Sequence, residues 1–382
     1  MQLIRNITII ARRYCAGEAW TNRMLAYARG FEENGCHVKL VFLITDEKRT
    51  PYAINIPGVE VVNLWESDNC FVRIHRGLSY LRNKRRIKSV IEDGDTCLMF
   101  DAGGFYLNEI LASGKDVKVM YEITEHPFIL DHTDHKEGNL RKRLKQYEKL
   151  DKLIVISKSL YDFFLTQGFP AEKLQIINMF VDLKRFEGVQ KTTNEKYIAY
   201  CGTVSYDKDG ADVLIQAFAK FNQLYPEYSL KIIGGGMSSE IIPQLTKLAE
   251  RCGVKDSVEF TGRIPASEMP QLLKNASILA LARPNNLQNA NGFPTKLGEY
   301  LATGNPVVVT SVGEIPVFIQ DGINGYVSKP DDYMSFAEKL DEAANALVNG
   351  INVGVKGKEL TFNEFNSRMQ TALALEILNS KN

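Results

Sequence analysis

The residues whose types and spacing best suit ligand binding and chemistry lie between positions 291 and 309. This stretch predicts a loop around Gly292, a helix that begins near Pro294 or Thr295, and a buried strand after it. The first turn of a helix presents unpaired N–H groups at the positive end of its dipole, so it can hold a phosphate. Glu299 lies about one turn into this helix, where its carboxylate can accept hydrogen bonds from vicinal hydroxyls.

Two further stretches carry glycines and a lysine in an informative order. Residues 200–218 predict a strand, a turn at Gly202, a loop that carries Lys208, and a helix. Three glycines that begin with Gly234 follow another strand and leave room for a ligand at its carboxyl end. Each pattern alone has an ordinary structural explanation, because solvated loop lysines and glycine turns are common.

Taken together, the stretches at 200–218 and 291–309 resemble the donor site of glycosyltransferase family 4. The resemblance implies an α/β protein of the GT-B fold, with two doubly wound Rossmann-like domains facing a central cleft. It also implies a hexosyl-type glycosyltransferase that retains the anomeric configuration and uses a UDP- or GDP-linked nucleotide sugar as co-substrate. The resemblance also implies that no cofactor and no metal are needed. The D-x-D patterns Asp207–Asp209 and Asp93–Asp95 lie in a loop and a turn that account for them.

The resemblance implies donor-binding roles for the stretch around residue 291. Glu299 is expected to contact the donor ribose, and the backbone amides of Gly292 and Phe293 are expected to face the sugar and phosphates. The helix start adds donor-binding candidates at Thr295, Lys296 and Leu297. Asn291 replaces the first of the family's two glutamates, and an amide can still donate and accept hydrogen bonds. Asn291 is therefore expected to alter donor preference before it abolishes activity.

The catalytic candidates are Lys208, His126 and Asn291. Lys208 comes first, because a lysine over the departing diphosphate stabilises charge that grows in the transition state. The family often has an arginine beside the turn glycine, here Gly202, whereas this chain has Thr203. Charge on the phosphates must then come from Lys208, from Arg263 or from backbone dipoles. Arg263 fits a donor contact and a surface position equally well. Gly234 completes the donor-binding candidates.

The N-terminal half is expected to bind the acceptor. Gly17 and Glu18 lie in a loop after the first strand that resembles the family's N-terminal glycine loop. Glu125 and His126 follow another strand, and the resemblance implies that His126 contacts the transferred sugar. A histidine before a proline at a strand end is also explained as a satisfied loop residue.

The segment Arg73–Lys88 is rich in basic residues and contains no acidic one. It is expected to attract an anionic membrane surface or a lipid-linked diphosphate acceptor. Nucleic acid is not expected as a partner, because Lys plus Arg and Asp plus Glu are both 46 and no aromatic platform accompanies the segment.

Alternating strand and helix patterns throughout predict parallel sheets covered by helices. The predicted strands are residues 3–10, 37–43, 59–64, 96–101, 117–123, 152–157, 174–178, 197–201, 229–233, 258–260, 277–281 and 306–309. The clearest predicted helix is Ala19–Glu33. A polar, aperiodic stretch at 186–194 predicts a linker, which gives an acceptor domain at 1–186 and a donor domain at 187–360. A helix within 361–382 is expected to cross back to the first domain.

Composition and cysteine usage fit a packed globular protein in a reducing compartment. With 382 residues the chain exceeds one core, and its six cysteines show neither close pairs nor zinc-ligand spacing. Without a signal-like or spanning apolar stretch, we expect a cytoplasmic protein, at most peripheral at the inner face of the membrane. Two alternatives stay open: a catalytically weak nucleotide-sugar binding or partner subunit with the same fold, and a nicotinamide oxidoreductase, which would need a G-x-G-x-x-G turn that the sequence lacks.

Overall fold

The computed structural model describes residues 5–11, 13–43, 54–64, 86–100, 106–130 and 136–379. Contacts divide the chain into two compact units. Unit 1 comprises Met1–Asn178 and Ser367–Asn382, and unit 2 comprises Met179–Asn366. The division falls between Asn178 and Met179, whereas the polar stretch at 186–194 had placed it near residue 186.

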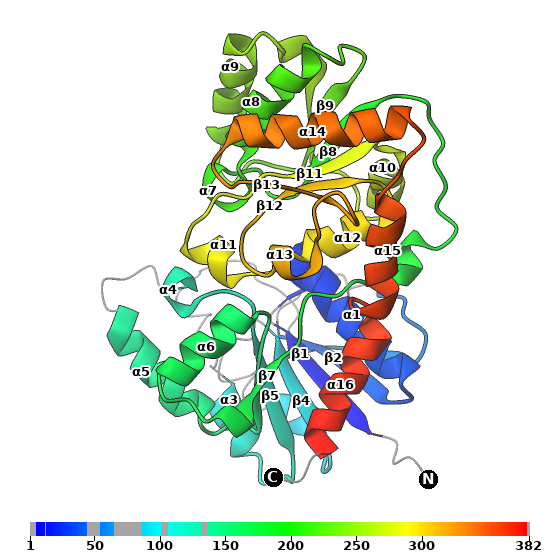
Figure 1. Ribbon diagram of the computed structural model, residues 1–382. Coiled ribbons are helices and arrows are strands. Elements are labelled where there is room, and N and C mark those ends of the chain that lie inside the picture. The colour runs from blue at the N-terminus through cyan, green and yellow to red at the C-terminus, as the bar shows by residue number, and fades with distance from the viewer. Residues whose placement is uncertain are drawn as a thin grey trace. The chain divides into compact units, whose positions relative to one another are not determined.

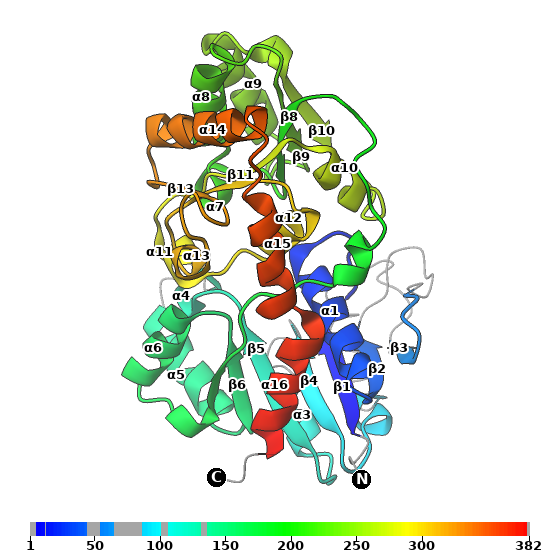
Figure 2. The same cartoon turned by 45° about the vertical axis from the view of Figure 1, so that its right-hand side comes forward.

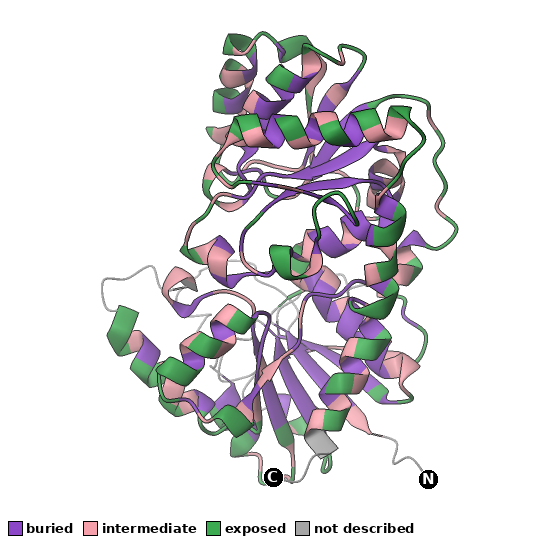
Figure 3. Ribbon diagram, viewed as in Figure 1, coloured by how far each residue is buried: buried purple, intermediate pink, exposed green. Residues whose placement is uncertain are grey.

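Unit 1 is built on a sheet of seven parallel strands (Figure 1). In spatial order they are β3 (Val59–Asn63), β2 (His37–Phe42), β1 (Asn6–Ala11), β4 (Thr96–Phe100), β5 (Lys118–Ile123), β6 (Lys152–Val155) and β7 (Leu174–Ile176). The central strands β1 and β4 are almost wholly buried, which explains their unbroken apolar sequences (Figure 3). Each predicted strand of this half is present, with ends that shift by a few residues.

Helices cover both faces of this sheet. They are α1 (Ala19–Glu33), α3 (Leu107–Leu111), α4 (Pro127–Leu130), α5 (Lys136–Tyr147), α6 (Lys158–Thr166) and α16 (Ser367–Asn379). The C-terminal helix α16 packs on α1, as both views show (Figure 2). A β-carbon on Gly30 would overlap the Ser367 carbonyl, and Asn34 Nδ2 donates to Thr371 Oγ1 at 2.9 Å. The end of the chain is thus part of unit 1.

Unit 2 is built on a second sheet, of six parallel strands. In spatial order they are β10 (Val258–Gly262), β9 (Ser229–Ile233), β8 (Tyr197–Cys201), β11 (Ile278–Leu281), β12 (Val307–Thr310) and β13 (Tyr326–Ser328). Strand β13 was not predicted. The other five agree with the sequence analysis.

Helices lie on both faces of this sheet as well (Figure 1). They are α7 (Tyr206–Asp209), α8 (Ala211–Asn222), α9 (Ile241–Arg251), α10 (Met269–Asn275), α11 (Leu287–Asn291), α12 (Thr295–Thr303), α13 (Ile315–Phe318), α14 (Tyr333–Val348) and α15 (Gly354–Asn363). Helix α14 packs on α8, and α12 packs on α10 and α15. Both sheets are therefore doubly wound, as predicted.

The strand order reverses once in each sheet, between β1 and β4 and between β8 and β11. In open α/β sheets a ligand binds outside the carboxyl ends of the strands at such a reversal. In unit 2 the segments that leave β8 and β11 there are residues 202–210 and 282–291. A ligand site is therefore expected at these two segments.

The polar stretch at 186–194 belongs to unit 2 and lies along α10. Gln271 Nε2 donates to the Gln190 carbonyl at 2.8 Å, and the Thr192 N–H donates to Asn275 Oδ1 at 2.8 Å. The polar composition of residues 186–194 therefore reflects solvent exposure and does not mark a linker between the units. In the part of the chain that the structure describes, no helix is long and apolar enough to cross a membrane.

Candidate active site

Three glycine turns end neighbouring strands of unit 2 and lie against one another. We call Gly202, Gly234 and Gly262 the glycine ledge; they follow β8 and β9 and end β10. The Gly202 N–H donates to the Ile233 carbonyl and the Gly234 N–H to the Gly262 carbonyl, both at 2.9 Å. A β-carbon on Gly234 would overlap the Gly202 carbonyl, and φ at Gly234 is 139°, a value that disfavours other residues. The three glycines therefore contribute only backbone to this part of the sheet edge.

Lys208 lies in a short helix, α7, whose backbone is held from several sides. Ser205 caps the helix, because its Oγ accepts from the Lys208 N–H at 3.2 Å. The buried Arg283, which follows β11, donates from Nε to the Lys208 carbonyl at 3.2 Å. Gly210 ends the helix at φ 62°, where a β-carbon would overlap the Ala282 carbonyl. Residues 202–210 and 282–291, the two segments at the strand reversal, are thus held against each other.

Two asparagines that were not selected from the sequence add hydrogen bonds between the same two segments. Asn286 Nδ2 and Asn289 Nδ2 both donate to the Asp207 carbonyl, at 2.6 and 3.3 Å. Asn289 is fully buried, and its Oδ1 has no hydrogen-bond partner among the described residues. Asn291 ends helix α11 nearby, with Nδ2 donating to the Leu287 carbonyl at 2.9 Å. The predicted catalytic residues Lys208 and Asn291 therefore lie on segments joined by hydrogen bonds.

A buried ion pair joins the same turn to the start of α12. Lys296 Nζ lies 2.5 Å from Asp209 Oδ2 and donates to the Tyr200 hydroxyl at 3.3 Å. Burial raises the pKa of Asp209, but Lys296 and Arg283 outweigh that effect, so the net pKa is lowered. Burial lowers the pKa of Lys296, and Asp209 opposes only part of that shift. Asp209, the second aspartate of the D-x-D pattern Asp207–Asp209, is thus paired with positively charged side chains of the protein.

Glu299 forms an ion pair with Arg185, a residue of the 3-10 helix Leu183–Phe186. Burial lowers the pKa of Arg185, but the Glu299 carboxylate outweighs it, so the net pKa is raised. Both side chains keep some exposure, 23% for Arg185 and 12% for Glu299. The carboxylate is therefore held in place yet reachable. Sequence reasoning missed Arg185, because nothing in its local pattern distinguishes it from a surface arginine.

The remaining donor candidates divide into buried and exposed positions. The Phe293 ring is buried and stacks on Phe318 with centroids 5.3 Å apart, so only its backbone can face a ligand. Leu297 is fully buried. Gly292 is buried, Thr295 is half-buried at the first position of α12, and Thr203 and Arg263 are exposed. A β-carbon on Gly235 would lie 3.3 Å from Arg263 Nε, which places Arg263 beside the glycines after β9.

The acceptor candidates of unit 1 follow the carboxyl ends of β1 and β5. Gly17 adopts φ 82° in the turn before α1, and the Glu18 carbonyl accepts from the Asn22 N–H at 3.0 Å. Glu125 is half-buried, and His126 is 4% exposed. The loop after β1 is also fixed by Thr21, whose Oγ1 accepts from the Cys15 N–H at 3.3 Å.

His126 lies against aromatic rings and is held as a neutral imidazole. Its ring centroid is 4.3 Å from that of Phe163 and 5.2 Å from that of Phe128. Burial lowers its pKa. Nδ1 accepts from the Phe128 N–H at 3.2 Å, which assigns the ring proton to Nε2. His126 can thus offer one hydrogen-bond donor to a sugar hydroxyl.

A buried network in unit 1 was not predicted. Arg23 of α1 pairs with Glu122 of β5, with Nη2 2.6 Å from Oε1, and both side chains are 1% exposed. The Tyr27 hydroxyl also donates to Glu122 Oε1, at 2.6 Å. Arg23 further donates to the Ile177 and Asn178 carbonyls, each at 3.0 Å. The only sequence signal was a glutamate in the middle of an apolar strand.

Two other predicted features have structural explanations. Asp95 Oδ2 accepts from Thr8 Oγ1 at 3.0 Å and from the Glu92 N–H at 2.9 Å, so the second D-x-D pattern closes a turn. Among the described residues no group of three or more His, Cys, Asp or Glu side chains could hold a metal ion. Most of the basic segment Arg73–Lys88 lies outside the described residues. Of its end, Ile87 is buried in the core and Arg86 donates to the Leu64 carbonyl.

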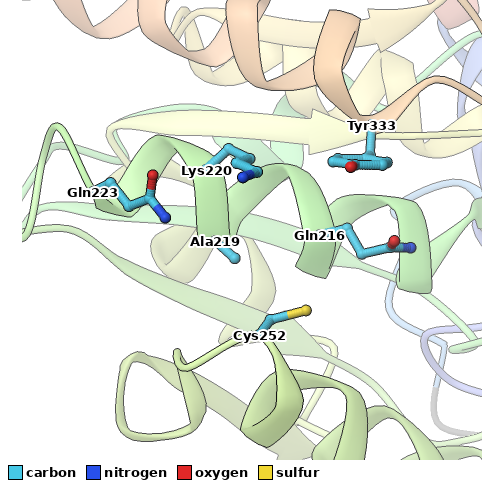
Figure 4. A pocket seen from close by; sticks show the side chains of 6 residues that line it. All are labelled: Gln216, Ala219, Lys220, Gln223, Cys252 and Tyr333. Atoms are coloured by element: carbon cyan, nitrogen blue, oxygen red, sulfur yellow. The ribbon is translucent and has the colours of Figure 1, made fainter.

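A surface pocket on α8 is unrelated to these residues (Figure 4). It is lined by Gln216, Ala219, Lys220, Gln223, Cys252 and Tyr333. No member of this set belongs to the glycine ledge or to the segments that hold Lys208. The pocket therefore adds nothing to the site.

The class of protein follows from comparison of this fold and site with known proteins. Residues 183–346 match the family Glycosyl transferases group 1, and this range contains the ledge, Lys208, Asn291 and Glu299. Residues 183–346 therefore match the kind of family that the resemblance implied, and the fold is the GT-B fold.

Named relatives match over part of their length. A D-inositol 3-phosphate glycosyltransferase of Corynebacterium urealyticum is 26% identical over 56% of this chain and 53% of the relative. A GDP-mannose-dependent alpha-(1-6)-phosphatidylinositol monomannoside mannosyltransferase of Mycolicibacterium smegmatis is 25% identical over 60% of this chain and 63% of the relative. The chain thus spans about half the length of such relatives.

Solved structures match along the whole chain. Anabaena HepE, in complex with UDP and glucose, superposes with a TM-score of 0.74 and 16% identity over 99% of this chain and 100% of that one. Staphylococcus aureus TarM, as a mutant in complex with UDP and other ligands, gives a TM-score of 0.76 and 13% identity over 99% and 100%. At these identities the likeness establishes the fold alone.

Proposed function

We propose that this chain is a retaining glycosyltransferase that moves a sugar from a UDP- or GDP-linked donor to a glycan or lipid-linked acceptor. The product would belong to cell-surface polysaccharide or glycoconjugate biosynthesis. One observation carries the proposal: the glycine ledge, the Lys208 turn and the start of α12 are joined at the carboxyl edge of one sheet. Exposed backbone, a lysine and a helix start together suit a diphosphate.

The names of similar proteins support a nucleotide-sugar donor. HepE has been crystallised with UDP-glucose, and the mycobacterial relative is named for GDP-mannose. Amylovoran and colanic acid biosynthesis glycosyltransferases are also among the relatives, which supports a polysaccharide product. Because the two named donors differ in base and sugar, they support the donor class without selecting one donor.

In the proposed reaction the bond between the anomeric carbon and the phosphate oxygen breaks, and its electron pair leaves with the nucleoside diphosphate. Lys208 and the first amides of α12 stabilise the charge that grows on the diphosphate. The acceptor hydroxyl attacks the oxocarbenium-like carbon from the face that the diphosphate leaves, so the configuration is retained. The hydroxyl proton passes to a phosphate oxygen, and no residue forms a covalent intermediate.

The other candidates take binding roles in this scheme. Glu299 accepts hydrogen bonds from the ribose hydroxyls, and the Gly292 and Phe293 amides face the donor. Asn291 contacts hydroxyls of the donor sugar. His126, through Nε2–H, contacts the transferred sugar as the resemblance implied.

The proposal is tested with a panel of UDP- and GDP-sugars. A donor that binds the folded protein raises its melting temperature, so one or a few sugars should stand out. Nucleoside diphosphate release in the presence of acceptor then measures turnover, and the anomeric configuration of the product is read by NMR. Donor binding without acceptor-dependent release would favour the nucleotide-sugar binding subunit, and an inverted product would disprove retention.

A further inference from the structure

The turn after β8 lacks a side-chain cation at the position beside its glycine. Thr203 stands where the family often has an arginine, and it is exposed and uncharged. A diphosphate carries several negative charges as it departs, and the single positive charge of Lys208 compensates only part of them. A second cation at this turn would have to come from elsewhere in unit 2.

Lys296 reaches this turn from the second position of α12. A β-carbon on Gly202 would overlap the Lys296 ammonium, so Nζ lies directly against the residue that precedes Thr203. The ammonium lies 4.8 Å from the centroid of the Tyr200 ring, which anchors it on the strand side. Its side chain is 15% exposed, so part of the side chain is accessible from solvent.

We propose that Lys296 supplies the diphosphate-binding charge that this chain lacks at Thr203, with Asp209 as the positioning residue that holds its ammonium at Gly202. This inference rests on the proposed function, because it names a residue of that donor site. It differs from the family assignment, in which the charge belongs to the residue after the turn glycine.

The hydrogen bonds of Lys296 leave capacity for a ligand. An ammonium has three N–H donors, and here two are directed to Asp209 Oδ2 and the Tyr200 hydroxyl. The third has no acceptor among the described residues. A phosphate oxygen can take that donor without breaking the ion pair, and it would favour the charged form that burial disfavours.

Asp209 is built to hold a cation in one place. It is 1% exposed, accepts from the Tyr200 hydroxyl at 2.6 Å, and lies 3.8 Å from Arg283 Nε through Oδ1. Helix α7 thus carries Lys208 itself and, through Asp209, positions the ammonium of Lys296.

A second lysine of unit 2 gives a matched control. Lys231 of β9 is 17% exposed, lies 4.6 Å from the Tyr197 ring centroid, and pairs with Glu195 and Glu259. Lys231 thus shares the ring contact, the carboxylate pairing and the low exposure of Lys296, but its carboxylate partners are exposed and it lies within the strand rather than at the ledge. Loss of an ion-paired lysine that contacts a ring is therefore separable from loss of Lys296 itself.

The test measures binding of UDP and GDP, and of uridine and guanosine by competition, to four proteins. These are the unaltered chain, Lys296→Met, Lys231→Met and the double variant Thr203→Arg/Lys296→Met, each with its melting temperature. For the diphosphate that binds, we expect Lys296→Met to lose about tenfold to a hundredfold in affinity, since a charge-assisted hydrogen bond is lost. Affinity for the nucleoside should change by less than about twofold in Lys296→Met. Lys231→Met should bind like the unaltered chain.

The double variant distinguishes a lost charge from a damaged fold. Arginine at position 203 should restore most of the diphosphate affinity, because it returns a cation to the same turn. If Lys296→Met binds the diphosphate like the unaltered chain, or loses diphosphate and nucleoside equally without rescue, the inference is wrong while the proposed function stands. If the unaltered chain binds neither UDP nor GDP, the proposed function fails and takes the inference with it.

Discussion

The Glu299 carboxylate pairs with Arg185, so a ribose that binds there meets a group already oriented by an ion pair. Glu299→Ala should weaken nucleoside diphosphate binding by about 1–3 kcal/mol, the cost of a lost hydrogen bond to a charged group. Titration calorimetry would measure this. The analogue without 2′- and 3′-hydroxyls should bind equally to Glu299→Ala and to the unaltered chain.

Arg185→Gln serves as the control for Glu299, because it removes the ion pair but keeps the carboxylate. We expect a smaller loss of affinity from Arg185→Gln than from Glu299→Ala. Dissociation constants that stay unchanged in Glu299→Ala would remove Glu299 from the donor site.

Lys208 should matter more while the diphosphate departs than while it is bound. Lys208→Ala is therefore expected to lower kcat more than it raises KM, measured in steady state with the donor found by the panel. The backbone of α7 is held through main-chain atoms of Asp207 and Lys208, so this change should leave the turn in place. If KM alone rises, Lys208 is a binding residue without a catalytic role.

At the scale of elements, the Arg23–Glu122 network joins α1 to β5 and to the carbonyls of Ile177 and Asn178, where the first segment of unit 1 ends. Removing one partner of a buried ion pair leaves an uncompensated charge, which costs about 3–5 kcal/mol. Glu122→Gln should therefore lower the free energy of unfolding of unit 1 by an amount of that order. Both tryptophans, Trp20 and Trp65, lie in unit 1, so fluorescence during denaturant unfolding reports on it selectively.

The matched control for this network removes both charges. Arg23→Met combined with Glu122→Leu leaves no unpaired charge and should destabilise unit 1 less than Glu122→Gln alone. A double variant less stable than the single one would show that the network contributes net stability beyond charge compensation.

At the scale of the whole molecule, the basic segment Arg73–Lys88 stays a prediction. Each basic residue near an anionic membrane adds about 1 kcal/mol of attraction, which salt screens. Cosedimentation with vesicles should need anionic lipid, weaken at high salt and fail when Arg82 and Arg85 are both changed to Glu. Arg86 is left unaltered because it donates to the Leu64 carbonyl.

Two exposed lysines of unit 2, Lys220 and Lys247, provide the charge-matched control for the membrane experiment. Their change to Glu alters net charge equally but should leave vesicle binding intact. Equal recovery of every protein in the supernatant would leave the basic segment as a solvated surface or as a site for a soluble acceptor.

The fold class and the local elements of the donor site could be predicted from the amino-acid sequence. Buried parallel strands are continuous apolar runs, and helix starts and glycine turns are local signals, so β8, β9 and α1 could be placed to the residue. The motif around Glu299 was readable for the same reason: its spacing is set within one loop and one helix.

Only the tertiary structure decided which side chains meet. Asp209 pairs with Lys296, Glu299 with Arg185, and Arg23 with Glu122, and the partners are separated by 87, 114 and 99 positions. The boundary between units was likewise a matter of long-range contacts, because the polar stretch at 186–194 packs on α10. Sequence patterns record the periodicity and burial of each segment, whereas such partners are chosen by how distant segments pack, which no local pattern encodes.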